Sequence, residues 1–170
     1  MTTKKRGLLS STKTLVILSL LCALSIVLEK FVGINTPVFR LNLGYLPVAL
    51  SGMLFGVGGA VFVGTLADLI SHMQYFNIFF ALLAMVESAI YGLFLNPIAK
   101  DKKDMLKKSI TCQLVITLIV HAGMNTLLLW VLYRSFNPIR FVSGALSFPL
   151  RAATLYFLLK YREQFEKQII

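Results

Sequence analysis

The chain of 170 residues is 57% hydrophobic and only 14% charged, and its mean hydropathy is +0.78. A water-soluble domain of this length could not cover so much apolar side chain, so the composition indicates an integral membrane protein. The length fits one domain spanning residues 1–170. The net charge is +10. The positions of the basic residues, next to apolar stretches, argue against a nucleic-acid-binding protein.

Twelve of the basic residues fall into three clusters, each beside a long apolar stretch. The clusters are Lys4, Lys5, Arg6 and Lys13; Lys100, Lys102, Lys103, Lys107 and Lys108; and Lys160, Arg162 and Lys167. Basic residues beside membrane spans mark the cytoplasmic side, so both termini are predicted to be cytoplasmic.

The middle of the chain is too long for one crossing. The stretch Tyr45–Leu95 contains no Lys or Arg. As a single helix it would be roughly 75 Å long, against a bilayer core of roughly 30 Å. It starts outside, after Arg40, and ends inside, before Lys100, so it must cross an odd number of times. Three short helices are predicted, with the first two separated by a turn at Gly56–Gly59.

The predicted fold is therefore an all-α bundle of six transmembrane helices. They are expected at Leu15–Val32, Tyr45–Phe55, Ala60–Ser71, Ile78–Leu95, Ser109–Tyr133 and Phe141–Tyr161. Outer loops are expected at Gly33–Asn42, His72–Asn77 and Arg134–Arg140, and a cytoplasmic loop at Asn96–Lys108. Pro149 is expected to kink the last helix.

Four ionisable residues lie within these spans: Asp68, Glu87, His121 and Arg151. A charge at mid-bilayer costs about 2.5–3.5 kcal/mol on insertion scales, so such residues usually face a partner or a cavity. Glu87 and Arg151 lie at similar depth from the outer surface. Their depth predicts a pair, which either joins two helices or contacts a ligand. Asp68, near an outer helix end, is either solvated or faces a ligand.

The outer segments are rich in aromatic and amide side chains, including Tyr45, Trp130 and Tyr133 and the run His72–Asn77. Such a rim suits a flat heterocyclic ligand, although an interfacial aromatic belt would look similar at Trp130 and Tyr133. Ser19 and Ala23 are small residues at a spacing of four. That spacing permits close helix approach, for internal packing or for docking onto another membrane protein. The chain has no GxxxxGK[ST] motif, so it is not expected to bind ATP itself.

The segment Thr36–Asp68, TPVFRLNLGYLPVALSGMLFGVGGAVFVGTLAD, resembles the substrate-binding S components of energy-coupling factor (ECF) vitamin transporters, most of all the folate type. IYGLFL at 90–95 and NTLLLWVLY at 125–133 also match, as do Arg140 and Pro149. The resemblance implies a six-helix protein that binds a vitamin at its outer face and carries it inward by reorientation in the membrane of a bacterial cell. It also implies docking, through Ser19 and Ala23, on a transmembrane coupling subunit that is joined to two ATPases. Those ATPases would hold ATP and Mg²⁺, and this chain would hold no cofactor.

The ligand-binding candidates combine both lines of reasoning. They are Arg40, Asn42, Asp68, His72, Gln74, Tyr75, Asn77, Glu87, Trp130, Tyr133, Arg140 and Arg151. The chain departs from the folate pattern in three places. The loop that reads YFPGFT in the family is Tyr75–Phe80 here, a family lysine is Ser143, and a family glutamine is Arg151. Folate is the expected substrate, with another vitamin such as cobalamin as the alternative. Two other classes are a membrane enzyme using Glu87, Asp68 or His121, and a pure assembly protein.

Overall fold

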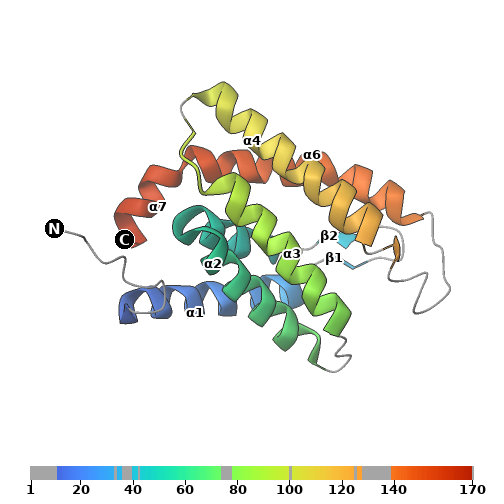
Figure 1. The fold of residues 1–170 in the computed structure, drawn as a ribbon, viewed down its shortest axis with the longest axis horizontal. Coiled ribbons are helices and arrows are strands. Elements are labelled where there is room, and N and C mark those ends of the chain that lie inside the picture. Colours follow the sequence, from blue (N-terminus) through green and yellow to red (C-terminus); the bar gives the residue numbers. More distant parts are fainter. Residues whose placement is uncertain are drawn as a thin grey trace.

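The protein is described here by a computed structural model that covers residues 11–32, 34–35, 40–41, 43–73, 78–99, 101–124, 126–127 and 139–169. Helices dominate these residues (Figure 1). The elements are α1 (Thr12–Val27), the π-helical η2 (Leu28–Val32), β1 (Ile34–Asn35), β2 (Arg40–Leu41), α2 (Tyr45–Ser71), α3 (Ile78–Leu95), α4 (Lys102–Val115), the π-helical η4 (Ile116–Met124), α6 (Ile139–Lys160) and α7 (Arg162–Ile169).

The predicted helical class is confirmed, with one small addition. The two short strands pair antiparallel, with Ile34 opposite Leu41 and Asn35 opposite Arg40, inside the predicted outer loop. Within the described residues, four helical segments are long and apolar enough to cross a membrane: Thr12–Val32, Tyr45–Ser71, Ile78–Leu95 and Lys102–Met124.

α2 is two helices joined at a sharp break. Gly56 has φ 74° and ψ −162°, a backbone conformation that a residue with a Cβ rarely adopts. The predicted break is confirmed, but helix resumes at Val57 instead of Ala60, because the backbones of Gly58 and Gly59 are helical. The amide of Asn96, beyond the end of α3, lies beside Gly56 on the side where a Cβ would be.

Glycines allow α2 and α3 to pack with their backbones nearly touching. A Cβ on Gly92 would lie 2.4 Å from the Cα of Val57, and one on Gly52 would lie 3.0 Å from the backbone nitrogen of Gly92. A Cβ on Gly64 would overlap the hydroxyl of Ser88. Small residues are what lets helix backbones approach so closely in a membrane. α2 and α3 therefore form a tight pair at the centre of the bundle.

The prediction for the segment Asn96–Lys108 was wrong in part, because α4 begins at Lys102. Asp101 precedes the helix, and Asp104 in its first turn suits the positive end of the helix dipole. Asp104 also pairs with Lys108 at 3.4 Å across one turn. The Lys108 ammonium donates hydrogen bonds to the carbonyls of Pro97 and Ile98, at 3.0 and 3.1 Å. These contacts make the charged segment helical, whereas its polarity alone suggested a loop.

The helix ends that carry the basic clusters gather at one end of the long axis of the molecule. In Figure 1 the start of α1, the connection between α3 and α4, and α7 all lie on the left. α7, which was not predicted, begins at Arg162. The Arg162 guanidinium donates to the carbonyls of Leu95 and Asn96, at 3.2 and 2.8 Å, and so joins α7 to the end of α3.

Replacing Gly92 with alanine adds one methyl group, and we expect this small change to destabilise the protein strongly. The new Cβ meets backbone, which cannot move aside as a side chain would, so α2 and α3 must separate. Overpacking of this kind costs typically ~1–3 kcal/mol. Gly58→Ala is the matched control, because Gly58 is helical and exposed. Thermal unfolding in detergent should show a lower midpoint for Gly92→Ala only; equal midpoints for the two variants would contradict the close contact.

Candidate functional site

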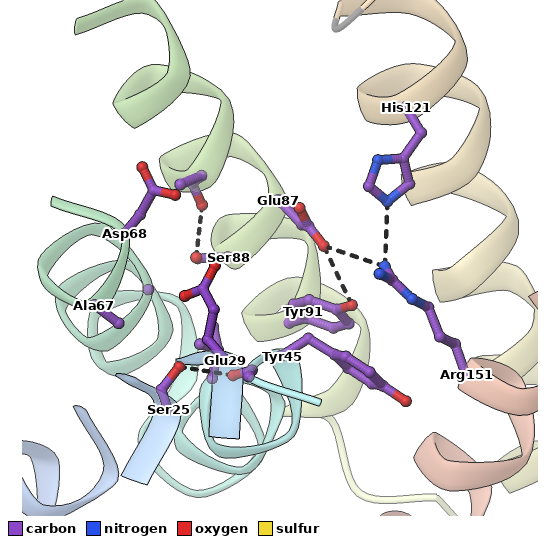
Figure 2. Close-up of a pocket in the computed structure, with 14 residues that line it drawn as sticks. Ser25, Glu29, Tyr45, Ala67, Asp68, Glu87, Ser88, Tyr91, His121 and Arg151 are labelled. Carbon is purple, nitrogen blue, oxygen red and sulfur yellow. Dashed lines mark hydrogen bonds and ion pairs between the residues drawn. The ribbon is translucent and has the colours of Figure 1, made fainter. Parts of the chain in front are cut away.

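The described residues form a pocket of about 220 Å³ between α1, η2, α2, α3, η4 and α6 (Figure 2). Its lining residues are Ser25, Glu29, Gly44, Tyr45, Val48, Gly64, Ala67, Asp68, Ala84, Glu87, Ser88, Tyr91, His121 and Arg151. Ligand pockets that bury a drug-sized molecule measure roughly 300–1,000 Å³. This pocket is smaller, so it suits one end of such a molecule.

Arg151, from α6, lies where three elements meet. Its Nη1 is 3.9 Å from Oε1 of Glu87 on α3, which confirms the predicted pair. The same nitrogen lies 3.2 Å from Nε2 of His121 on η4. A guanidinium only donates, so Nε2 accepts the hydrogen bond and the ring carries its hydrogen on Nδ1. Figure 2 shows the Glu87 carboxylate and the imidazole approaching Arg151 from opposite helices.

Two tyrosines form the aromatic side of the pocket. The rings of Tyr45 and Tyr91 are stacked, with centroids 6.3 Å apart and planes 18° apart. The Arg151 guanidinium lies over the Tyr45 ring, 4.9 Å from its centroid, in a cation–π contact. The Tyr91 hydroxyl donates to Glu87 at 3.5 Å. The aromatic, cationic and acidic groups thus form one connected network.

The Tyr45 hydroxyl is fixed by α6. It lies 2.5 Å from the hydroxyl of Thr154, and Thr154 donates its hydrogen to the carbonyl of Arg151 at 2.8 Å. Since a hydroxyl has one hydrogen to donate, Tyr45 is the donor to Thr154. This series of hydrogen bonds orients the Tyr45 ring beneath the Arg151 guanidinium.

The opposite side of the pocket is acidic. Glu29 reaches it from η2 and Asp68 from the last turn of α2. Ser25, also in the lining, donates to the carbonyl of Gly44 at 2.7 Å and so ties α1 to the start of α2. We call Glu29 and Asp68 the acidic wall. With Glu87, the lining residues that the structure describes include three carboxylates and one guanidinium.

His72 lies behind this wall instead of lining the pocket. Its Nδ1 is 3.2 Å from Oδ1 of Asp68, and its Nε2 is 3.9 Å from Oε1 of Glu29. The hydrogen bond with Asp68 is the main cause of a raised pKa at His72, followed, after an opposing effect of burial, by attraction to both carboxylates. The side chain is 53% exposed, so solvent weakens these interactions.

Some of the predicted ligand-binding residues line the pocket and others do not, or lie outside the described residues. Their contacts with a ligand stay predictions. Asp68, Glu87 and Arg151 line the pocket together, and His72 contacts Asp68 from outside. Only the backbone of Arg40, in β2, and of Arg140, in α6, is described. The remaining candidates, Asn42, Gln74, Tyr75, Asn77, Trp130 and Tyr133, lie outside the described residues.

Sequence reasoning left several lining residues off the list of candidates. Glu29 lies near the outer end of the predicted first helix, Leu15–Val32, and Ser25, Ser88 and Tyr91 carry no charge that distinguishes them from their apolar neighbours. His121 was named as an ionisable residue in a span and as a possible catalytic group of the enzyme alternative, but not as a ligand-binding residue. Its position in the sequence between apolar residues was the available signal, since a polar residue in a span usually faces a cavity or a partner.

A double-mutant cycle should measure the pair at the centre of the pocket. Glu87→Gln, Arg151→Gln and the double variant are expected to give a coupling free energy of about 0.5–3 kcal/mol. The Asp104–Lys108 pair on α4 is the control, because an i,i+4 pair at a helix surface contributes only about 0.3–0.5 kcal/mol. Chemical or thermal unfolding of the purified variants provides the measurement. A coupling at 87–151 no larger than at 104–108 would mean that the pair is no stronger than an ion pair at a helix surface, and would contradict its central role in the pocket.

Comparison with known proteins places the chain in a family. A family model described as ECF-type riboflavin transporter, S component, matches residues 9–149. The folate transporter FolT of Clostridium novyi (strain NT) is 31% identical over 167 residues, which cover 93% of this chain and 94% of that protein. The crystal structure of FolT bound with folic acid shares the fold, with a TM-score of 0.77 and 23% identity over 88% of this chain and 92% of that one. The chain therefore belongs to the S components of ECF transporters, a family of transport subunits and not of enzymes, as its sequence predicted.

Proposed function

We propose that this protein is the folate-binding S component of an ATP-driven ECF uptake transporter. The observation that carries the proposal is the 31% identity to a folate transporter along almost the whole of both chains. The fold shared with a FolT bound to folic acid agrees with it. The matched family model is named for riboflavin, so family membership alone does not choose the vitamin. Cobalamin, the alternative expected from the sequence, has no support in these matches.

The chemistry of the pocket supports the same choice. The pterin ring of folate presents an amino group and a ring N–H side by side, and a carboxylate accepts such a pair of donors. Asp68 and Glu29 supply carboxylates at one wall, and the stacked rings of Tyr45 and Tyr91 offer an aromatic surface at another. A pocket of about 220 Å³ suits the flat head of the vitamin better than the whole molecule.

The proposed topology has six crossings with both termini in the cytoplasm of a bacterial cell. The break at Gly56 divides α2 into two crossings, and α1 with η2, α3, α4 with η4, and α6 supply the others. The helix ends that adjoin the basic clusters lie at one end of the molecule, and this supports the orientation. The pocket then opens toward the outer side.

Docking and energy supply belong to partners in this proposal. Ser19 and Ala23 are both exposed on α1, beside the exposed side chains of Val16, Leu20 and Leu24. This face would contact the transmembrane coupling subunit, and two ATPases bound to that subunit would hydrolyse ATP with Mg²⁺. Small residues on an exposed helix face allow the close approach that such docking needs.

The purified protein, stripped of bound ligand, should bind folic acid more tightly than riboflavin or cobalamin. Asp68→Asn should weaken folic acid binding by about 10-fold or more, because a charged hydrogen-bond acceptor is lost from a partly buried site. Asp104→Asn, at the other end of the bundle, should bind like wild type. Titration calorimetry measures folic acid binding by the wild type and by both variants. Tighter binding of riboflavin would refute the substrate, and unchanged affinity in Asp68→Asn would refute the site.

The docking face has its own test. Ser19→Leu combined with Ala23→Leu should abolish uptake of folic acid by cells that express the complete transporter, while the isolated protein still binds the vitamin. Ala153→Leu is the control, because Ala153 is also exposed on a helix but lies on α6. Normal uptake by the double variant would show that this face of α1 does not dock.

A further inference from the structure

His72 joins two elements that form the acidic wall. It follows the last residue of α2, one turn after Asp68, while Glu29 belongs to η2. One ring nitrogen faces each carboxylate, at 3.2 Å for Asp68 and 3.9 Å for Glu29. Both carboxylates line the pocket, and the imidazole does not. Any effect of His72 on a ligand in this pocket is therefore exerted through the two carboxylates.

The protonation state of the imidazole decides whether it can hold both carboxylates. A protonated ring donates from Nδ1 and from Nε2, whereas a neutral ring donates from one nitrogen and presents a lone pair at the other. In the neutral state one of the two carboxylates would face that lone pair. The repulsion between Asp68 and Glu29 would then no longer be offset by a positive charge between them. The separation of η2 from the end of α2 is thus best fixed when His72 is charged.

The ring lies in surroundings that favour its charged form. Among the described residues, the charged groups that act on it are Asp68 of α2 and Glu29 of η2, and both raise its pKa. A group whose pKa is higher in the folded state stabilises that state at pH values below its unfolded pKa, about 6.5 for histidine. The stabilisation is lost as the pH rises through the folded pKa. The bridge should therefore weaken between about pH 6.5 and mildly alkaline pH.

We propose that His72 is a positioning residue, which in its protonated form bridges Asp68 and Glu29 and holds the acidic wall ready for the hydrogen-bond donors of the vitamin. The inference rests on the proposed function and deepens it, because it makes vitamin affinity depend on pH. A carboxylate has two oxygens, so the contact of His72 with Oδ1 of Asp68 does not prevent Asp68 from also accepting a hydrogen bond from the vitamin.

The test compares folic acid binding by the full-length protein and by His72→Gln between pH 6 and pH 8. Wild-type affinity should fall by about 5-fold or more over this range, the lower end of coupling between linked sites. His72→Gln should bind more weakly at pH 6 and lack this fall. Titration of folic acid itself affects both proteins equally, so the difference between them is the readout. A wild-type profile that is flat, or that matches the variant, would overturn the proposal.

A second measurement separates positioning from a merely structural role. By linkage, a ligand that prefers the protonated form must raise the proton affinity of His72 by the same factor by which protonation raises the ligand affinity, so the His72 pKa rises by the logarithm of that factor. Histidine NMR titrations of the ligand-free and folic-acid-bound protein should show this rise, and an unchanged His72 pKa would refute positioning. The binding series is repeated with riboflavin. If the protein binds folic acid but the wild type and His72→Gln show the same pH dependence, the role of His72 is refuted and the proposed function stands. If instead affinity depends on pH and on His72 for riboflavin but not for folic acid, the proposed substrate is refuted and the positioning role of His72 stands.

Discussion

A guanidinium in the middle of an apolar bundle must be surrounded by groups that stabilise its charge. The described structure is arranged around the guanidinium of Arg151. Glu87 comes from α3, His121 from η4 and Tyr45 from α2, so each partner holds a different element against α6. The same contacts therefore pack the helices together and compensate the charge of Arg151. Removing one partner would leave a poorly compensated charge, which costs more than the pair itself contributes.

The pocket combines a rigid pair of helices with two irregular helix ends. Close contacts at Gly64 and Gly92 fix α2 against α3, and these helices carry Asp68 and Glu87. The other acidic and imidazole groups come from π-helical segments, Glu29 from η2 and His121 from η4. π-Helical turns are frequent at functional sites, where the change in winding aims a side chain that a regular helix would direct elsewhere. Rigid walls thus set the spacing, and the irregular ends complete the lining.

Much of this arrangement is readable in the sequence, because the bilayer restricts the choices. Helix Ile78–Leu95 was predicted to the residue, and the break at Gly56 followed from the length that a single helix would have had. The Glu87–Arg151 pair followed from depth alone. The helical start of α4 at Lys102 was not predicted, because hydropathy contains no information about ion pairs and contacts with carbonyls such as those of Lys108. The bridge from His72 to Glu29 was also missed, since it joins residues far apart in the chain and depends on how η2 is wound.

The distribution of charge bears on why this pocket would take folate when the family model is named for riboflavin. With His121 accepting a hydrogen bond from Arg151, the described part of the lining carries three carboxylates and one guanidinium, a set of charges that repels an anionic group. The glutamyl end of folate is anionic, and its pterin end is neutral and rich in donors. In the predicted topology, the sequence of the outer loops contains the basic residues Arg40, Arg134 and Arg140. An acidic interior with basic outer segments therefore suits a ligand that enters head first and leaves an anionic tail outside. Riboflavin has no carboxylate, so for riboflavin the same outer arginines would have no charged partner.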